Sequence, residues 1–348
     1  MMPRKDSVRL LSRRQAVATM VGGVGLLAAP AIGRAQAPLK VSFVQQRGLL
    51  YIPVDEMVSG GILQKEATKL GLGKVEATVT SLSGPGPVID AILTGAADYG
   101  TAALPSLLTL WSKTKGTPQE VKAVGTMSNG AMTLYTTNPN VKTIADFTDK
   151  DRIAVPTVGI SFNSMMLQMA AEKLWNEPMR LDHLTVGLSH PDAVAAMSAG
   201  FGRSTVTAHI AVQPFTSRGL KIPGAHIVAD SREVFGGQLT QITLLASKST
   251  KEKNPQLFQA VANALEESIK VANADKRAAA ALWKEAQKAT ESVDELVELL
   301  NDPGFEFTSQ PKRIETFAAF LNRTGRLKDK LGSWKDLFWE TAHKQQGG

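Results

Sequence analysis

The chain has 348 residues, and its 39 basic and 32 acidic side chains give a formal net charge of +7. It contains no cysteine, which excludes disulfides, thiolate metal sites, a catalytic thiol and a lipid-modified cysteine. Six of the basic residues and one acidic residue lie in residues 1–37, so the other 311 residues carry a net charge of +2. With no cluster of basic and aromatic residues either, we expect no nucleic-acid partner.

Residues 1–37 have the pattern of an export signal. Basic residues lead into Ser12-Arg13-Arg14-Gln15, an apolar run covers 16–32, and Ala35-Gln36-Ala37 supplies small residues for cleavage. The paired arginines indicate the twin-arginine route. A membrane anchor is the alternative, but the run is shorter than the ~20 apolar residues that a span needs and contains several glycines. We predict cleavage after Ala37 and a periplasmic location.

Strands and helices alternate in the first part of the exported chain. Strands are expected at 40–44, 75–79, 98–102 and 121–125. Helices are expected to begin near residues 53, 87 and 105, where prolines suit the first helical turn. This alternation is typical of parallel sheets covered by helices. It predicts a first α/β lobe.

The next region repeats the same alternation. Strands are expected at 132–136, 152–155, 184–187 and 204–210, and residues 239–246 are expected to return the chain across this second sheet. Helices are expected at 143–147, after Ser161 and at 192–199. The methionines after Ser161 have helical spacing, which indicates core packing and not a metal site.

From residue 254 onward the sequence is almost wholly helical, with no sheet of its own to cover. We therefore expect these helices to return to the first lobe. The predicted architecture has one lobe from 38–130 and 250–348, a second lobe from 131–249, a hinge and a cleft between them. Because open α/β sheets bind ligands beyond the carboxyl ends of their strands, strand-to-helix turns of both lobes are expected to face this cleft.

Three of these turns have the chemistry of a neutral-walled site for an anion or a carbonyl group. A helix N-terminus offers unpaired amides and the positive end of the helix dipole. Gly159 permits close backbone approach, and Thr157 and Ser161 offer hydroxyls. Turns 83–84 and 100–102 are expected to act similarly. The alternative is that Thr157 and Ser161 only cap their own helix.

Three segments carry a resemblance to a known family: 92–108 (ILTGAADYGTAALPSLL), 141–161 (VKTIADFTDKDRIAVPTVGIS) and 190–200 (HPDAVAAMSAG). The chain resembles the periplasmic substrate-binding proteins of ABC importers in the nitrate, sulfonate, taurine and pyrimidine-precursor group. The resemblance implies a periplasmic binding protein type II fold, in which two doubly wound sheets close about a hinge on a small-molecule ligand. It also implies ABC permease subunits at the inner membrane as partners, and we expect a monomer.

The sequence departs from relatives of this fold in two places. His209 stands near the position where many relatives have an acidic residue. Amino-acid receptors of the fold use an Arg and Asp pair for the zwitterion, and the sequence shows no such pair clearly placed. We therefore expect no amino-acid ligand. The chain also lacks the cysteine-rich motif of pyrimidine-synthase relatives.

The candidate ligand-binding residues come from the expected turns and strand ends. Arg47 is either a countercharge or a surface residue. Tyr51 and Phe215 either stack on a planar ligand or pack the lobes, and His209 either faces the ligand or is structural. The full set is Gln46, Arg47, Tyr51, Ser83, Gly84, Thr101, Ala102, Ser128, Asn129, Thr157, Gly159, Ile160, Ser161, His209, Gln213 and Phe215.

The sequence gives little support for catalysis. Residues 159–163 nearly match a nucleophile elbow, but the last position is Asn where Gly is needed. The five histidines lack metal-ligand spacing. We expect no enzyme activity, cofactor or metal, and a receptor for a sulfonate, an aromatic carboxylate or a pyrimidine-like compound. A periplasmic enzyme acting on such a compound and a sensory subunit of the same fold are the alternatives.

Overall fold

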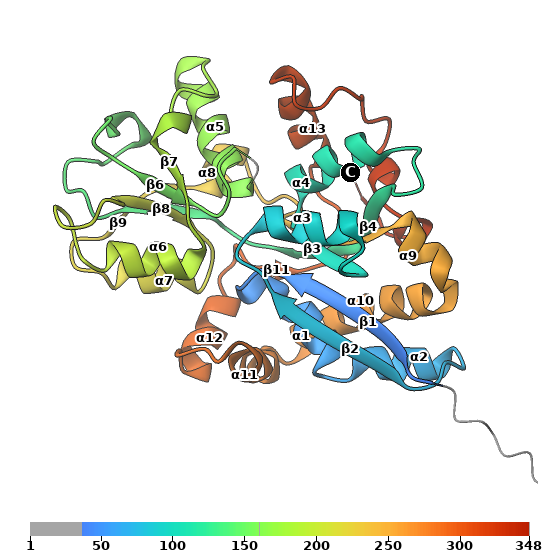
Figure 1. Ribbon diagram of the computed structural model, residues 1–348. Helices are drawn as coiled ribbons and strands as arrows, with labels where there is room; N and C mark the ends of the chain where they lie inside the picture. Colours follow the sequence, from blue (N-terminus) through green and yellow to red (C-terminus); the bar gives the residue numbers. More distant parts are fainter. Residues whose placement is uncertain (1–36, 160, 348) are drawn as a thin grey trace, which may run out of the picture. The chain divides into compact units, whose positions relative to one another are not determined.

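The strands of the chain form two separate mixed sheets, seen in the computed structural model of Figure 1. The structure describes residues 37–159 and 161–347, so residues 1–36 of the expected export signal and Ile160 lie outside the described residues. From Ala37 onward the chain forms one compact unit. None of the helices in this part is long and apolar enough to cross a membrane.

The first sheet has six strands in the order β11-β4-β10-β3-β1-β2. Their bounds are β1 Leu39–Gln45, β2 Val75–Ser81, β3 Tyr99–Ala103, β4 Val121–Asn129, β10 Ile242–Ser247 and β11 Glu306–Phe307. β1 runs parallel to β2 and β3, whereas β10 is antiparallel to both β3 and β4. We call this sheet and its helices the first lobe.

The second sheet has five strands in the order β7-β6-β8-β5-β9. Their bounds are β5 Thr133–Thr136, β6 Ile153–Val155, β7 Thr185–Gly187, β8 Ala208–Ala211 and β9 His226–Asp230. β6 runs parallel to β7 and β8, and β5 is antiparallel to β8 and β9. This sheet and its helices form the second lobe.

One expected strand lies in a different sheet. Residues 239–246 were expected to cross the second sheet, but β10 lies between β3 and β4 of the first sheet. Its six residues are all buried, and Thr243 Oγ1 donates to the Ala102 carbonyl at 3.0 Å. A strand buried on both faces has no alternation to show which sheet it joins. This antiparallel strand also makes the first sheet mixed, where the alternation of elements indicated a parallel one.

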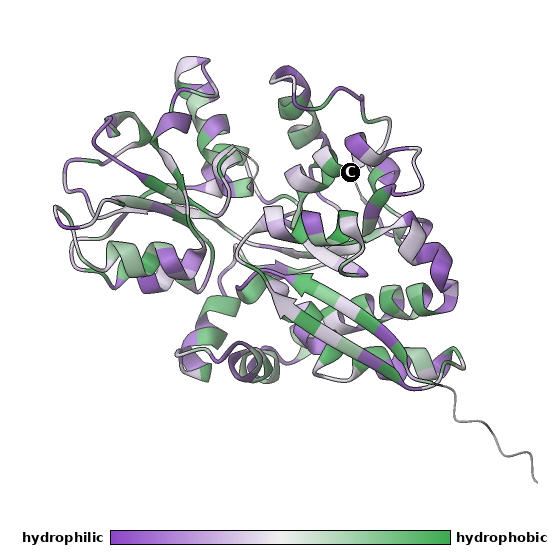
Figure 2. Cartoon of the chain, in the orientation of Figure 1, coloured by the Kyte–Doolittle hydropathy of each residue, from purple (hydrophilic) through white to green (hydrophobic). Residues whose placement is uncertain are grey.

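Helices cover the sheets. Their bounds are α1 Ile52–Val58, α2 Ile62–Lys69, α3 Pro85–Thr94, α4 Leu104–Thr114, α5 Phe162–Trp175, α6 His190–Met197, α7 Phe215–Leu220, α8 Ser231–Phe235, α9 Lys248–Lys253, α10 Pro255–Ala274, α11 Lys276–Gln287, α12 Val293–Leu300 and α13 Ile314–Arg323. Short 3-10 helices span Leu49–Tyr51, Ile144–Asp146, Asp182–Leu184, Trp334–Leu337 and Glu340–Ala342. Figure 2 shows several helices with both apolar and polar residues along their length.

The C-terminal helices pack on helices from the first part of the chain. α10 packs against α1 and α2, α11 packs against α1, and α13 packs against α4. The apolar stripe of α10 is buried, with Phe258 2% exposed and Val261 fully buried. The last part of the chain therefore completes the core that the first part begins.

The chain crosses between the sheets twice, at 130–132 and at 236–241. Each crossing is hydrogen-bonded to an element beside the other one: the Gln241 amide donates to Asn129 Oδ1 at the end of β4 at 3.3 Å, and the Met132 amide donates to Ser231 Oγ at the start of α8 at 2.9 Å. At Gly130 a Cβ would lie 2.7 Å from Leu50 Cδ2. A side chain at this position would therefore have to displace Leu50, and these two crossings form the hinge.

Candidate functional site

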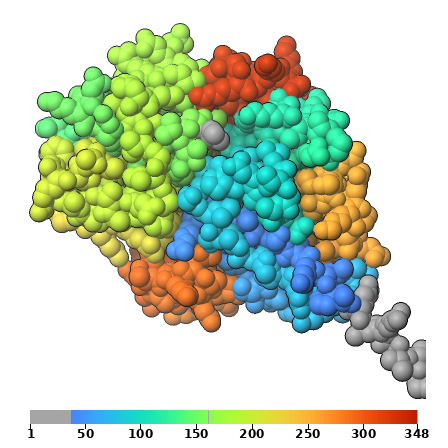
Figure 3. Space-filling view, viewed as in Figure 1, coloured from blue at the N-terminus to red at the C-terminus, as the bar shows by residue number. Residues whose placement is uncertain are grey.

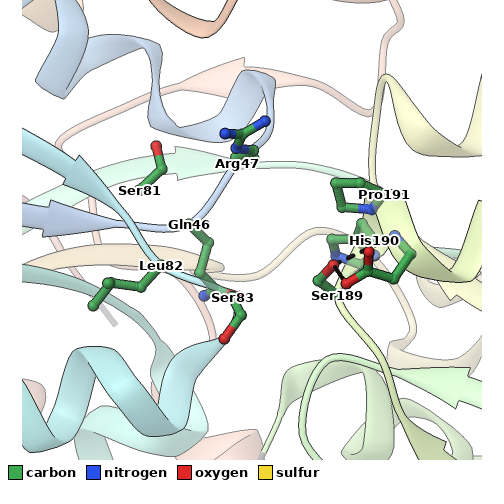
Figure 4. Close-up of a pocket in the computed structure, with 9 residues that line it drawn as sticks. Gln46, Arg47, Ser81, Leu82, Ser83, Ser189, His190 and Pro191 are labelled. Carbon is green, nitrogen blue, oxygen red and sulfur yellow. Dashed lines mark hydrogen bonds between the residues drawn. The ribbon is translucent and has the colours of Figure 1, made fainter.

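A polar cavity of about 290 Å³ lies where residues of the two lobes meet. Figure 3 shows the first-lobe segments in blue and cyan against second-lobe segments in yellow-green. The lining residues are Gln46, Arg47, Ser81, Leu82 and Ser83 from the first lobe and Ser189, His190, Pro191 and Asp192 from the second. In Figure 4 the two groups face each other across the cavity. This is the region beyond the carboxyl ends of β1, β2 and β7, where open α/β sheets place ligands.

The first-lobe wall is set by the register of two parallel strands. Gln45 at the end of β1 pairs with Ser81 at the end of β2, and the Leu82 amide donates to the Gln45 carbonyl at 2.8 Å. The residues that follow each strand therefore lie side by side. Ser81 Oγ donates to Gln287 Oε1 at 3.2 Å, which ties this wall to α11.

Arg47 supplies the positive charge of the cavity. It lies two residues after the end of β1, and its side chain is exposed. Within the described residues, no acidic side chain forms an ion pair with it. The guanidinium is therefore available to a ligand and presents several N–H donors in a planar fork.

The second-lobe wall is the first turn of α6. Ser189 is the N-cap: its hydroxyl accepts from the Asp192 amide and donates to the Asp192 carboxylate. Pro191 has no N–H, so this turn offers few free amides. The carboxylate already complements the positive end of the helix. Side chains, and not the bare helix terminus, therefore give this wall its chemistry.

His190 is the start of a buried polar chain. Its Nδ1 lies 2.9 Å from His209 Nε2, and His209 Nδ1 lies 3.0 Å from the Tyr135 hydroxyl. Burial lowers the pKa of His190 to about 4. Burial and the nearby His190 together lower the pKa of His209 well below its usual value. Both imidazoles are neutral at pH 7.

Several predicted site residues are brought together by the structure. Gln46, Arg47 and Ser83 line the cavity. The turns at Gly84 and Thr157 face each other: a Cβ on Gly84 would lie 3.1 Å from Thr157 Oγ1. At this pair a turn of the first lobe lies next to a turn of the second lobe.

Other predicted residues lie inside the protein and do not line this cavity. Thr101 and Ala102 are buried within β3. Ser128 Oγ donates to the Leu50 carbonyl at 2.7 Å, and Asn129 Nδ2 donates to Glu306 Oε2 at 3.2 Å. These side chains support the strands and the first crossing of the hinge.

The two aromatic candidates pack inside the protein. Tyr51 is 5% exposed and Phe215 is 3% exposed, and Phe215 stacks against His190 with ring centroids 5.4 Å apart. His209 is fully buried behind His190. Gln213 lines a different cavity of about 160 Å³ near the hinge. The aromatic and imidazole groups of this region therefore support the wall that His190 forms.

The turn at 157–161 mainly organises its own helix. Ser161 is 2% exposed, and its hydroxyl accepts from the Ser164 amide at 3.2 Å as the N-cap of α5. Gly159 has φ 72°, a conformation that favours glycine. Ser161 therefore caps its own helix, which is the alternative given above for its role. Ile160 lies outside the described residues.

Six lining residues were missed by sequence reasoning: Ser81, Leu82, Ser189, His190, Pro191 and Asp192. The sequence predicts a helix at 192–199, and a capping Ser followed by Pro and Asp marks its start, but no local pattern places this turn at the cavity. The sequence showed no clearly placed Arg and Asp pair, yet the structure puts Arg47 and Asp192 on opposite walls of one cavity. Their separation by 145 positions hides the pairing in the sequence.

The two sheets, the double crossing and the shared cavity define a periplasmic binding protein fold. The chain has this fold in common with the alkanesulfonate-binding protein SsuA from Xanthomonas axonopodis pv. citri bound to MOPS, with a TM-score of 0.65 and 17% identity over 87% of this chain and 98% of that one. The aliphatic sulphonate binding protein SsuA from Escherichia coli gives a TM-score of 0.60 and 18% identity over 86% and 99% of the two chains.

A third structure of this kind is the nitrate-binding protein NrtA from Synechocystis PCC 6803. Its TM-score is 0.60, with 14% identity over 75% of this chain and 70% of that one. No curated protein sequence matches the chain. Residues 75–279, more than half of the chain, match the family described as NMT1/THI5 like, and the chain belongs to this family.

Proposed function

We propose that this chain is the solute-binding receptor of an ABC import system. It captures a small organic anion or a planar heterocycle by hinge closure and delivers it to a permease. The observation that carries the proposal is the cavity itself, because both lobes contribute polar side chains to one site. A ligand held there contacts both lobes only when they are together.

The size and the chemistry of the cavity favour a small ligand with acceptor atoms. Its volume of about 290 Å³ lies at the low end of ligand pockets, which run from roughly 300 to 1,000 Å³. Arg47 offers a countercharge, and Ser83 and Gln46 offer neutral hydrogen-bonding groups. A sulfonate, an aromatic carboxylate and a pyrimidine-like compound all fit this description.

The neighbouring structures support the same class. Two of them are named as sulfonate-binding proteins and one as a nitrate-binding protein, and all three have the fold of this chain. The low sequence identity gives no support for one of these ligands over another. The substrate class therefore rests on the cavity and is open to direct test.

The remaining parts of the proposal concern location and partners. A receptor of this type works where the permease meets its solute, which agrees with the periplasmic export expected from residues 1–37. We propose a monomer that docks on ABC permease subunits at the inner membrane. A periplasmic enzyme and a sensory subunit are the competing assignments.

A thermal-shift screen tests the proposal. The probes are methanesulfonate, MOPS, nitrate, benzoate, uracil and cytosine. A ligand at ~100 times its dissociation constant adds about 2.7 kcal/mol to the free energy of unfolding. Arg47→Gln should weaken an anionic hit at least about tenfold in calorimetry. The matched control is Arg180→Gln, at an exposed arginine that does not line the cavity.

The same hits separate the competing assignments. A receptor returns its ligand chemically unchanged, whereas an enzyme converts it, and mass spectrometry after overnight incubation distinguishes the two. Uptake of the hit by proteoliposomes containing the permease separates import from sensing. A screen in which no compound of these classes binds would contradict the proposed ligand class.

A further inference from the structure

A hydrogen-bonded chain of three side chains runs from the cavity wall into the core of the second lobe. His190 lines the cavity and is 8% exposed, whereas His209 and Tyr135 are fully buried. The chain has two links, between His190 Nδ1 and His209 Nε2 and between His209 Nδ1 and the Tyr135 hydroxyl. His190 Nε2 is left without a partner among the described residues.

The number of protons in this chain is fixed by burial. Because burial keeps both imidazoles uncharged at pH 7, each carries a single N–H, and Tyr135 carries a single O–H. Burial also holds the pKa of Tyr135 above its usual value, so its hydroxyl stays protonated. The three side chains therefore carry three protons. The two hydrogen bonds use two of them, and the third stays at one end of the chain.

Only two arrangements satisfy both links. In the inward arrangement His190 Nδ1–H donates to His209, and His209 Nδ1–H donates to the Tyr135 oxygen. In the outward arrangement the Tyr135 hydroxyl donates to His209, and His209 Nε2–H donates to His190 Nδ1. The two differ in which end of the chain keeps an unused proton.

The inward arrangement leaves the Tyr135 O–H without an acceptor. Tyr135 is fully buried, and no second partner of its hydroxyl is found in the described part of the chain. An unpaired buried donor disfavours a state by about tenfold or more. The outward arrangement instead places the unused proton on His190 Nε2, at the cavity, where a ligand or water accepts it.

We infer that His190 presents Nε2–H to the cavity as a fixed hydrogen-bond donor, so that the ligand places a lone pair of an oxygen or of an unprotonated ring nitrogen against it. His190 is thus a specificity-determining residue, and His209 and Tyr135 are positioning residues that hold its tautomer. The inference rests on the proposed function only in taking this cavity as the ligand site.

The packing around the chain holds its members in place. Phe215 stacks on the His190 ring with an interplanar angle of 19°. A Cβ at position 219 would lie 2.1 Å from the Tyr135 hydroxyl oxygen, so only glycine in α7 leaves room for the tyrosine. The three rings therefore have little freedom to break the chain and re-form it in the inward direction.

The test reads the tautomers without any ligand. The full chain is labelled with ¹⁵N-histidine, and two-bond ¹H–¹⁵N correlation spectra at pH 8 assign the proton of each ring, with His190→Gln and His209→Gln used for assignment. The expected result is that both His190 and His209 are Nε2–H tautomers. A proton on His190 Nδ1 would overturn the inference.

Tyr135→Phe tests the origin of the tautomer. Removing the phenol proton should give a mixture of tautomers at His209 and His190, whereas Tyr51→Phe, at a buried tyrosine of the first lobe, should leave both unchanged. Unchanged tautomers in Tyr135→Phe would show that Tyr135 does not set the tautomers of His209 and His190. If that variant does not fold, the tautomers of the unsubstituted chain still decide the direction.

Benzoate and benzamidine test the consequence for ligands, because they have similar shapes but opposite hydrogen-bonding groups. We expect at least tenfold tighter binding of benzoate, and tighter or equal measurable binding of benzamidine would overturn the inference. Absence of binding by every compound counts against the proposed function. The tautomer measurement is independent of that outcome.

Discussion

At the scale of single residues, His190 is the side chain of the cavity whose loss should cost most for ligand binding. His190→Ala removes the Nε2–H donor and leaves His209 without its partner, so a hit from the screen should bind about ten- to hundredfold more weakly. His190→Gln retains an N–H donor on a side chain of related length and should recover part of this loss. Calorimetry of both variants makes the measurement, and equal affinities for the two would contradict a donor role.

The same residue shows the limit of sequence reasoning at this scale. The strand pattern before His209 drew attention to that histidine, but it is fully buried and the neighbouring His190 reaches the cavity. The two positions are 19 residues apart and meet only because α6 packs on β8. By contrast, the places of Gln46, Arg47 and Ser83 at the cavity could be predicted, because they lie one or two residues after strands whose ends are visible in the sequence.

At the scale of elements, the first crossing of the hinge depends on a close backbone approach. Gly130→Val places a side chain 2.7 Å from Leu50 Cδ2 and 3.1 Å from Gln241 Oε1, so it should reduce the free energy of unfolding by about 1–3 kcal/mol. Gly86→Ala is the matched control: it lies in α3, its Cβ meets nothing within 4 Å, and it should be neutral or stabilising by up to about 1 kcal/mol. Urea unfolding followed by circular dichroism measures both. Equal midpoints would show that the crossing tolerates a side chain.

The elements themselves were largely predictable, because hydrophobic periodicity and proline positions mark them. The expected strands at 40–44 and 75–79 correspond to β1 and β2, and the helical region expected from residue 254 begins with α10. The sheet that β10 joins was not predictable, since all six of its residues are buried and carry no pattern that distinguishes one sheet from another. Pairing between distant strands arises only in the assembled sheet, and no short segment of the sequence indicates its distant partner.

At the scale of the whole molecule, contacts between the lobes hold them around the cavity. Arg218 in α7 pairs with Glu291, with Nη2 and Oε2 2.7 Å apart, and Glu291 is 8% exposed. The Arg218 guanidinium holds the pKa of Glu291 below its usual value, against the opposing effect of burial. Arg218→Met should favour separation of the lobes and lower the affinity for a ligand by a few-fold. More of the binding free energy is then needed to close the lobes. Small-angle X-ray scattering of the ligand-free variant should give a larger radius of gyration, and an unchanged radius and affinity would contradict this role.

The pH dependence of stability is also a property of the whole molecule, because buried carboxyl and imidazole groups act in opposite directions. Burial raises the pKa of Asp55 to about 7, although Gln45 and Gln287 donate to it. The folded chain then binds more protons than the unfolded chain between about pH 4 and 7, and stability from this group falls as the pH rises through that range. The lowered pKa of His190 has the opposite sign: stability falls as the pH drops from about 6.5 towards 4.

Asp55→Asn separates these two effects. The substitution removes a buried carboxylate whose shift of about three pKa units corresponds to about 4 kcal/mol, at about 1.4 kcal/mol per unit. The variant should therefore be more stable than the unsubstituted chain at pH 8, and its advantage should shrink at pH 5, where Asp55 is already protonated. In this variant the free energy of unfolding should rise from pH 4 to 6.5. Over this range the unfolded chain releases the proton that it binds at His190, and this proton favours unfolding. Urea unfolding at pH 5 and pH 8 makes the comparison, and a difference that is the same at both pH values would mean that Asp55 does not titrate in this range.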